Sequence, residues 1–331
     1  MSQVDRLTSP PAPIHDDGRR RRTNAVRIHG LTISFVNIMP DGGFDAAERS
    51  FLELIEAGAG TRTVRVRRYT LPGVRRSADM DRRVKSAYRP IGQLWSDPPD
   101  AVILTGTEPL QADLRAESYW EPLAALLTWC ATNTVSTLLS CLAAHAAILM
   151  FNGIERRPLP KKLSGVFDHK VVMRHPLVQG LGEVVPVPHS RFNDVPADEL
   201  RGHGYSVLLE SATAGWSLST TARERCLFVL NQGHPEYVPT SLLKEYRRDV
   251  RRFLDGAVGV PPDIPEGYLA GSALEQLRAH RSALIDTRTP EPRFPYNEGA
   301  AGVVANWRPA AERLFANWLG EVERRVATRW C

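Results

Sequence analysis

The apolar and polar positions of the chain alternate in a way that predicts strands and helices in turn. From Ile33 onward, a short β-branched or apolar run, a turn and a longer amphipathic stretch repeat several times. Such alternation is typical of an α/β domain, in which helices flank a mainly parallel central sheet. The predicted strands cover residues 33–38, 64–69, 101–105, 135–140 and 227–231, and the predicted helices between them cover residues 44–57, 119–132 and 142–151.

The pattern changes after Gly153, which stands where the C-cap of the third helix is expected. Glycine, proline and polar residues then separate short segments that predict an added antiparallel hairpin region, at residues 163–172, 182–187, 205–209 and 216–219. Helical spacing returns at residues 241–254 and 310–327, whereas residues 258–293 are rich in proline and glycine and are expected to wrap the surface. We therefore predict a disordered tail at residues 1–25, a main domain at 26–257 and a C-terminal extension at 258–331 that packs on it.

Composition narrows the class of protein. The chain has 331 residues, of which 43% are hydrophobic and 24% charged, as in ordinary soluble globular proteins. The formal charge of +5 is small and spread along the folded part, so nucleic acid is not an expected partner. No apolar run approaches the roughly 20 residues needed to cross a bilayer. The four cysteines form no CxxC pair, which argues against a zinc site or a disulfide scaffold and for a reducing, cytoplasmic location.

One cysteine stands where the pattern switches from strand to helix. Cys141 follows the apolar run 135–140 and precedes an alanine-rich helix, so we expect it in a tight turn at the carboxyl edge of the sheet. Ligand chemistry in open α/β sheets collects at that edge. A thiolate at a helix N-terminus is stabilised by N–H groups and by the helix dipole, which suits a nucleophile. The opposing interpretation is a small core residue, because the turn lacks the flanking glycines of a nucleophile elbow.

A histidine and a glutamate follow another buried-looking strand, in Gln232-Gly-His-Pro-Glu-Tyr237. Residues i and i+2 of an extended stretch point the same way, and Pro235 fixes the backbone between them, so Glu236 can share a site with His234. His145, four residues past the cysteine, is interpreted as a core histidine, with a hydrogen-bond donor to the site residues as the alternative. No group of His, Asp and Glu has metal-ligand spacing such as H-E-x-x-H, so we predict no catalytic metal.

Several motifs in order resemble the homoserine O-succinyltransferase family, over a span that begins near Ile33 and continues to the last helix. They are Phe35-Val-Asn-Ile-Met-Pro40, Leu104-Thr-Gly-Thr107, Tyr119-Trp120, Ser136-Thr-Leu-Leu-Ser-Cys141, Lys162-Leu-Ser-Gly-Val-Phe167, Pro188-His-Ser-Arg191, Gly233-His-Pro-Glu-Tyr237, Arg248-Asp249 and Leu314-Phe-Ala-Asn-Trp-Leu319. The resemblance implies a fold similar to class I glutamine amidotransferases, used to transfer an acyl group from acyl-CoA, as co-substrate, to an amino-acid hydroxyl. It makes residues 26–257 the acyltransferase catalytic domain, with no bound cofactor.

The resemblance also implies roles for individual residues. Cys141 would carry the acyl group, His234 would accept protons and Glu236 would be its partner. The residues that match the family's amino-acid-binding positions are Lys162, Ser190 and Arg248, and the guanidinium of Arg248 suits an α-carboxylate. In the reaction so implied, the N–H of Leu142 and a second donor near Gly106 or Thr107 would hold the oxyanion.

Departures from the family pattern leave the substrates open. Asp41-Gly42-Gly43 stands where the family has lysines, and Lys170 stands where it has a histidine. In the family the acyl donor follows one position, with glycine for succinyl-CoA and glutamate for acetyl-CoA; this chain has Leu110 there, which favours succinyl without excluding acetyl. Homoserine is the expected acceptor and serine the alternative. A homodimer is left open.

Two other functions compete with acyl transfer. A glutamine amidotransferase would share the Cys and His-Pro-Glu pattern, but the glycine-flanked cysteine and a synthetase domain are missing. A sensor or interaction protein on the same fold would keep Cys141, His234 and Glu236 only as relics. Ammonia release from glutamine would identify the first, and trapping of an acyl-enzyme would exclude the second.

Overall fold

The computed structural model describes residues 30–287 and 293–328, so the predicted tail at residues 1–25 lies outside the described part. The contacts of the chain divide it into two compact units. The first holds the described parts of residues 1–153, 220–230 and 315–331, and the second holds residues 154–219 and the described parts of 231–314. Both units are built from segments that are distant in sequence.

The first unit contains the strands predicted to be parallel. Its strand order is β2 (Val64–Tyr69), β1 (Leu31–Val36), β3 (Ala101–Leu104), β4 (Ser136–Ser140) and β9 (Cys226–Asn231). Strand β1 pairs in parallel with β2 and β3, and β3 pairs in parallel with β4. Every residue of β3 and β4 is buried, as expected for central strands covered on both faces.

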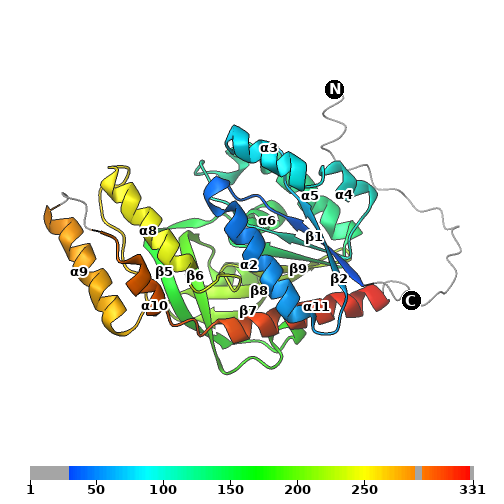
Figure 1. Ribbon diagram of the computed structural model, residues 1–331. Helices are drawn as coiled ribbons and strands as arrows, with labels where there is room; N and C mark the ends of the chain where they lie inside the picture. The colour runs from blue at the N-terminus through cyan, green and yellow to red at the C-terminus, as the bar shows by residue number, and fades with distance from the viewer. Residues whose placement is uncertain (1–29, 288–292, 329–331) are drawn as a thin grey trace, which may run out of the picture. The chain divides into compact units, whose positions relative to one another are not determined.

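Helices of the first unit follow the strands, as the alternation predicted. They are α2 (Asp41–Ala59), α3 (Ala78–Ala87), α4 (Gly92–Ser96), the short 3₁₀ helix η1 (Leu114–Ala116), α5 (Trp120–Asn133), α6 (Leu142–Asn152) and the end of α11 (Arg308–Thr328). Gly153 ends α6 with φ of 70°, which confirms the predicted C-cap. Helix α2 packs closely on α11, because a Cβ on Gly58 would lie 2.8 Å from the Ala316 nitrogen (Figure 1).

The second unit carries the antiparallel region. Strands follow one another in the order β8 (Gly215–Arg223), β7 (Ser206–Ser211), β5 (Arg157–Val171) and β6 (Val184–Asp194). Strand β5 runs antiparallel to both β6 and β7. The fold is therefore α/β with parallel and antiparallel strand pairs, in agreement with the prediction of hairpins added to a parallel sheet.

The helices of the second unit correct one expectation. They are η2 (Pro176–Val178), α7 (Ala197–Gly202), α8 (Ser241–Leu254), α9 (Gly271–Thr287), α10 (Tyr296–Ala301) and the start of α11. Residues 258–293 were expected to wrap the surface, but α9 lies within them, and Leu277 and Leu284 are fully buried in one cluster with Leu242 of α8. Figure 1 shows α8, α9 and α10 gathered beside β5. The apolar spacing of α9 is sparse, which concealed the helix in the sequence.

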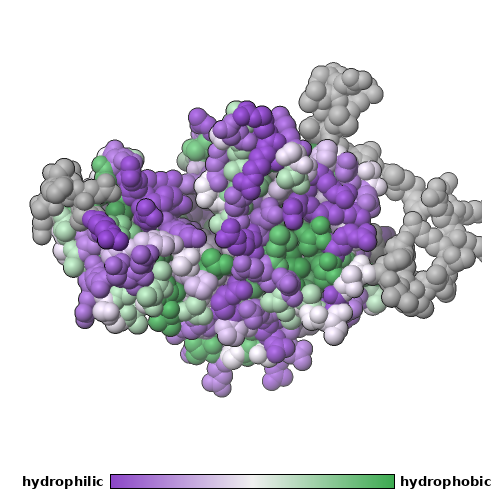
Figure 2. Space-filling model, viewed as in Figure 1, coloured by the Kyte–Doolittle hydropathy of each residue, from purple (hydrophilic) through white to green (hydrophobic). Residues whose placement is uncertain are grey.

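The exposed faces of the helices are mainly polar and their buried faces are mainly apolar. No helix in the described part of the chain is long and apolar enough to span a membrane. The faces seen over α3 and over α8 are mainly hydrophilic in Figure 2. Helix α8 turns Leu243, Tyr246 and Val250 inward, and Arg247 and Arg251 stay exposed.

Candidate active site

The turn at Cys141 in the first unit is strained. Cys141 lies between β4 and α6 with φ of 49° and ψ of −107°, a left-handed conformation that disfavours a residue with a side chain. Such strain costs on the order of 1–3 kcal/mol and collects at functional sites. Ser140 and Leu142 on either side are buried, while Cys141 is partly exposed. The sharp turn therefore presents the thiol although the flanking glycines of an elbow are absent.

The backbone around Cys141 offers N–H groups for an oxyanion. Helical bonding begins with the N–H groups of Ala144 and His145, which donate to the Cys141 carbonyl at 3.0 and 3.2 Å. Because the first N–H groups of a helix have no partner within it, the N–H of Leu142 is available to a ligand. Gly106, after β3, lies against this turn: a Cβ there would be 3.3 Å from the Leu142 nitrogen and 3.4 Å from Cys141 Cβ. The predicted oxyanion donors are thus neighbours in the first unit.

The loop after Gly106 is held by a buried carboxylate. Glu117, only 6% exposed, accepts from the backbone N–H groups of Leu110 at 2.5 Å and of Gln111 at 2.6 Å. Thr107 is half-buried and the Leu110 side chain is 63% exposed. The backbone at the predicted acyl-specificity position is therefore fixed while its side chain faces solvent. Sequence reasoning did not identify Glu117, since its contacts arise from the loop conformation.

His234 and Glu236 meet in the second unit as their spacing predicted. The Nδ1 of His234 lies 2.8 Å from the Glu236 carboxylate, and both side chains are buried. A carboxylate accepts but does not donate, so Nδ1 carries the proton and Nε2 is the basic nitrogen. The His234 backbone N–H donates to the Pro188 carbonyl at 2.7 Å, which fixes the loop on β6.

Tyr237 connects this histidine to a second carboxylate. Its ring stacks on the His234 ring with centroids 4.2 Å apart. Its hydroxyl donates to Glu245 of α8. Ser190, on β6, also donates its hydroxyl to Glu245, and Lys162 Nζ lies 3.3 Å from it. Two of the predicted amino-acid-binding residues, Lys162 and Ser190, therefore converge on a carboxylate that sequence reasoning missed.

Charges around Glu245 keep it ionised. Burial alone would raise the pKa of Glu245, but the charges of Lys162 and Arg248, with hydrogen bonds from neighbouring hydroxyls, hold that pKa below its usual value. Arg248 lies 4.0 Å from Glu245 and 2.9 Å from Asp249, and its side chain is 44% exposed. Asp249 also binds Lys162 Nζ at 2.6 Å. Arg252 lies 3.9 Å from Asp249 as well. The centre thus pairs two carboxylates with a partly buried lysine and two accessible arginines.

Helix α8 shows why Glu245 was missed in the sequence. Glu245 and Asp249 are four residues apart and lie on one face of the helix, and Asp249 falls on the buried side. A carboxylate is rarely buried unless it is paired, so an acidic residue on the buried side of a helix indicates a charged or hydrogen-bonding partner. Among arginine-rich neighbours, however, both residues look like ordinary surface charges in the sequence.

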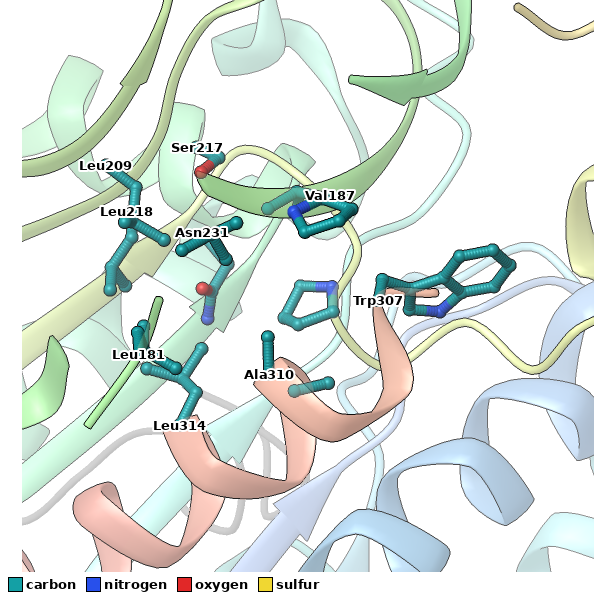
Figure 3. Close-up of a pocket in the computed structure, with 13 residues that line it drawn as sticks. Leu181, Val187, Leu209, Ser217, Leu218, Asn231, Trp307, Ala310 and Leu314 are labelled. Carbon is teal, nitrogen blue, oxygen red and sulfur yellow. The ribbon is translucent and has the colours of Figure 1, made fainter. Parts of the chain in front are cut away.

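A cavity lies next to the His234 loop but is not a substrate site. It is lined by Pro235, by Val187 and Asn231, and by Trp307 and Leu314 among others (Figure 3). Its volume of about 20 Å³ is of the size of one water molecule and too small for an amino acid or an acyl chain. Among the described residues, no group of three or more His, Cys, Asp or Glu could hold a metal ion.

Comparisons with known proteins agree with the motifs. A family model described as homoserine O-succinyltransferase matches residues 17–327. The chain is 41% identical over 320 residues to a homoserine O-succinyltransferase of Rhodopseudomonas palustris, covering 96% of this chain and 95% of the relative. It is 38% identical over 323 residues to one of Cardiobacterium hominis, covering 97% and 90%.

The likeness to a solved structure concerns the fold alone. A crystal structure of a glutamine amido transferase from Methylobacillus flagellatus matches with a TM-score of 0.50 and 17% identity, covering 88% of this chain and 96% of that one. The expected amidotransferase-like α/β fold is thereby confirmed.

Proposed function

Because the chain belongs to the homoserine O-succinyltransferase family, we propose that it transfers a succinyl group from succinyl-CoA to the side-chain hydroxyl of L-homoserine, in methionine biosynthesis. The observation that supports a covalent route best is the strained turn at Cys141. A positive φ at a residue with a side chain is costly, and here it presents a partly exposed thiol between two buried residues, as a nucleophile requires.

The first half of the proposed reaction forms an acyl-enzyme. The thiol of Cys141 gives its proton to Nε2 of His234, and the thiolate attacks the thioester carbonyl of succinyl-CoA. The N–H of Leu142 and a donor of the Gly106–Thr107 loop stabilise the oxyanion. When the tetrahedral intermediate collapses, the bond to the CoA sulfur breaks, and the CoA thiolate takes the proton from His234.

The second half returns the enzyme to its resting state. The homoserine hydroxyl gives its proton to His234, and its oxygen attacks the acyl-cysteine carbonyl. The bond to Cys141 breaks, and the thiolate recovers a proton from the imidazolium. Glu236 keeps the imidazole in the Nδ1–H tautomer and stabilises the imidazolium in both halves.

The Glu245 centre suits the amino-acid end of the acceptor. A carboxylate has about four lone-pair positions, and Tyr237, Ser190 and Lys162 together use three of those on Glu245. The remaining position, with the negative charge, suits the α-ammonium of homoserine. The accessible guanidinium of Arg248 suits its α-carboxylate.

Steady-state rates test the substrates. Succinyl-CoA and acetyl-CoA are each paired with homoserine and with serine, and release of CoA is followed. We expect the highest kcat/KM for succinyl-CoA with homoserine. A higher kcat/KM with acetyl-CoA would make acetyl-CoA the acyl donor, and a higher kcat/KM with serine would make serine the acceptor. Release of ammonia from glutamine at a comparable rate would show that the protein hydrolyses amides instead of transferring acyl groups.

A further inference from the structure

Two histidines that the proposed reaction does not use are paired inside the second unit. His169 on β5 and His189 on β6 are both fully buried. Their rings are nearly parallel, 14° apart, with centroids at 5.0 Å. The two Nε2 atoms are 3.1 Å apart, and Nδ1 of His169 lies 2.9 Å from the Phe167 carbonyl oxygen. Such a chain of contacts restricts where the protons are.

Only one arrangement of protons satisfies both contacts for neutral rings. The Phe167 carbonyl can only accept, so Nδ1 of His169 carries a proton and its Nε2 carries a lone pair. Nε2 of His189 must then donate to it. Nδ1 of His189 is left as an acceptor, and it has no hydrogen-bond partner among the described residues. A proton added to Nδ1 of His189 would be a buried N–H without an acceptor on a charged ring.

The pair lies directly under the loop that carries His234. A Cβ on Gly233 would come within 3.1 Å of Nε2 of His189 and within 2.5 Å of a Val187 methyl, so the loop packs on this ring at van der Waals distance. The next residue along β6 toward the N-terminus, Pro188, accepts the His234 backbone N–H.

Strand β6 also contacts the Glu245 centre. Ser190, which follows His189 directly, donates its hydroxyl to Glu245. Residues 188–190 therefore hold the His234 loop through a carbonyl and Glu245 through a hydroxyl, and the His189 side chain anchors this segment in the core. A displacement of His189 would move both groups.

We propose, on the basis of the function proposed above, that the His169–His189 pair is a neutral, single-tautomer anchor that positions His234 and Ser190 for acyl transfer. The two histidines are positioning residues, since neither touches the reacting atoms. A proton on Nε2 of His169 removes the lone pair that accepts their hydrogen bond, and a proton on Nδ1 of His189 places an N–H without an acceptor in the core.

The electrostatic surroundings favour the uncharged pair. Burial lowers the pKa of His169 to about 4, and burial with the nearby charge of Arg191 lowers the pKa of His189 well below its usual value. The charge of Asp168 raises the pKa of His169, and the charge of His234 lowers the pKa of His189 further. Lys170, Glu210 and Glu266 line the groove on which His169 borders.

These directions predict how the pair contributes to stability. The unfolded chain takes up protons on both histidines near pH 6.5, whereas in the folded chain His169 resists protonation until about pH 4 and the pKa of His189 is lowered in the same direction. The contribution of the pair to stability is therefore complete above pH 6.5 and is lost as the pH falls from 6.5 toward 4. Variants that lack the pair should lose this part of the pH dependence.

The state of the pair can be observed in the resting protein. Long-range ¹H–¹⁵N spectra of the full chain with ¹⁵N-labelled histidine report which ring nitrogen is protonated. We expect His169 as the Nδ1–H form and His189 as the Nε2–H form, both unchanged between pH 5.5 and 8. Titration of His169 or His189 within this pH range would overturn the proposal.

Substitutions test the positioning role. His189→Leu removes the donor and should lower kcat about 10²-fold, the effect of a misplacement of about 1 Å. His189→Gln retains an amide donor and should recover most of kcat, and His203→Gln should leave it unchanged. Equal losses for Leu and Gln, in folded proteins, would reduce His189 to a space-filling residue and contradict the proposal.

The experiments distinguish an error in the proposed function from an error in the proposal about the histidine pair. If the wild-type chain turns over neither acyl-CoA, the histidine spectra still report the pair, because they need no substrate. If the wild type is active while the spectra show either ring charged at pH 7, the anchor alone is wrong.

Discussion

The ring of Tyr237 stacks on the ring of His234 at 20° from parallel, while the Tyr237 hydroxyl donates to Glu245. One side chain thus joins the proposed proton acceptor to the carboxylate proposed to bind the acceptor amino acid. The stack limits rotation of the imidazole, and the hydroxyl helps to keep Glu245 ionised. The two contacts can be separated by substitution.

Tyr237→Phe keeps the ring and removes the hydroxyl. Because a hydrogen bond to a charged group is worth about 1.5–3 kcal/mol, we expect the KM for homoserine to rise about tenfold or more, with kcat nearly unchanged. Tyr237→Leu removes the stack as well and should also lower kcat. Steady-state kinetics with Tyr246→Phe as the control, whose buried hydroxyl has no hydrogen-bond partner within the described residues, separates these effects. Equal kinetics for Tyr237→Phe and Tyr237→Leu would show that the stack has no function.

Glu236→Gln preserves the shape of the side chain but removes its charge. The amide no longer stabilises an imidazolium, and it does not enforce the Nδ1–H tautomer of His234. By analogy with loss of the orienting acid of a triad, kcat should fall about 10²- to 10⁴-fold, with small changes in both KM values. A kcat within a factor of three of the wild type would remove Glu236 from the mechanism.

Arg248→Leu should affect one substrate and spare the other. If the guanidinium binds the α-carboxylate of homoserine, the KM for homoserine rises about tenfold to hundredfold while the KM for succinyl-CoA changes little. Arg251→Leu is the matched control, because Arg251 lies on the same helix and pairs with the exposed Asp255. Parallel rises in both KM values would assign Arg248 a structural role through Asp249.

Leu110→Glu tests the acyl-donor position. The Leu110 side chain is exposed, and Glu117 holds its backbone, so a glutamate fits there without disturbing the loop. A like charge at an exposed site costs up to about 1 kcal/mol, so the ratio of succinyl-CoA to acetyl-CoA kcat/KM should fall roughly fivefold. A strong wild-type preference for acetyl-CoA that Leu110→Glu leaves unchanged would reject both the succinyl donor and the assignment of this position.

Local patterns predicted most of the elements that carry the proposed chemistry. The predicted bounds 64–69 and 241–254 coincide with β2 and α8, because each has a regular period and clear ends. The turn at Cys141 and the contact of His234 with Glu236 follow from short spacings, which local geometry determines. Helix α9 was missed because its buried leucines are far apart among polar residues.

Long-range contacts account for what the sequence did not reveal. Glu245 becomes part of the candidate site through Ser190 and Lys162, which are 55 and 83 residues away in the chain. The pairing of His169 with His189 depends on the register of β5 and β6, and a shift of one residue would turn one ring to the opposite face. Neither relationship has a local sequence signal, so only the folded chain makes them visible.

Direct detection of the acyl-enzyme tests the central claim. The full chain is mixed with succinyl-CoA in the absence of an acceptor, quenched in acid and examined by mass spectrometry of the intact protein and its peptides. Our mechanism predicts a mass increase of one succinyl group, located on the peptide with Cys141, discharged by homoserine and absent from Cys141→Ala. An active enzyme without this adduct, or near-normal turnover by Cys141→Ala, would contradict covalent catalysis by Cys141.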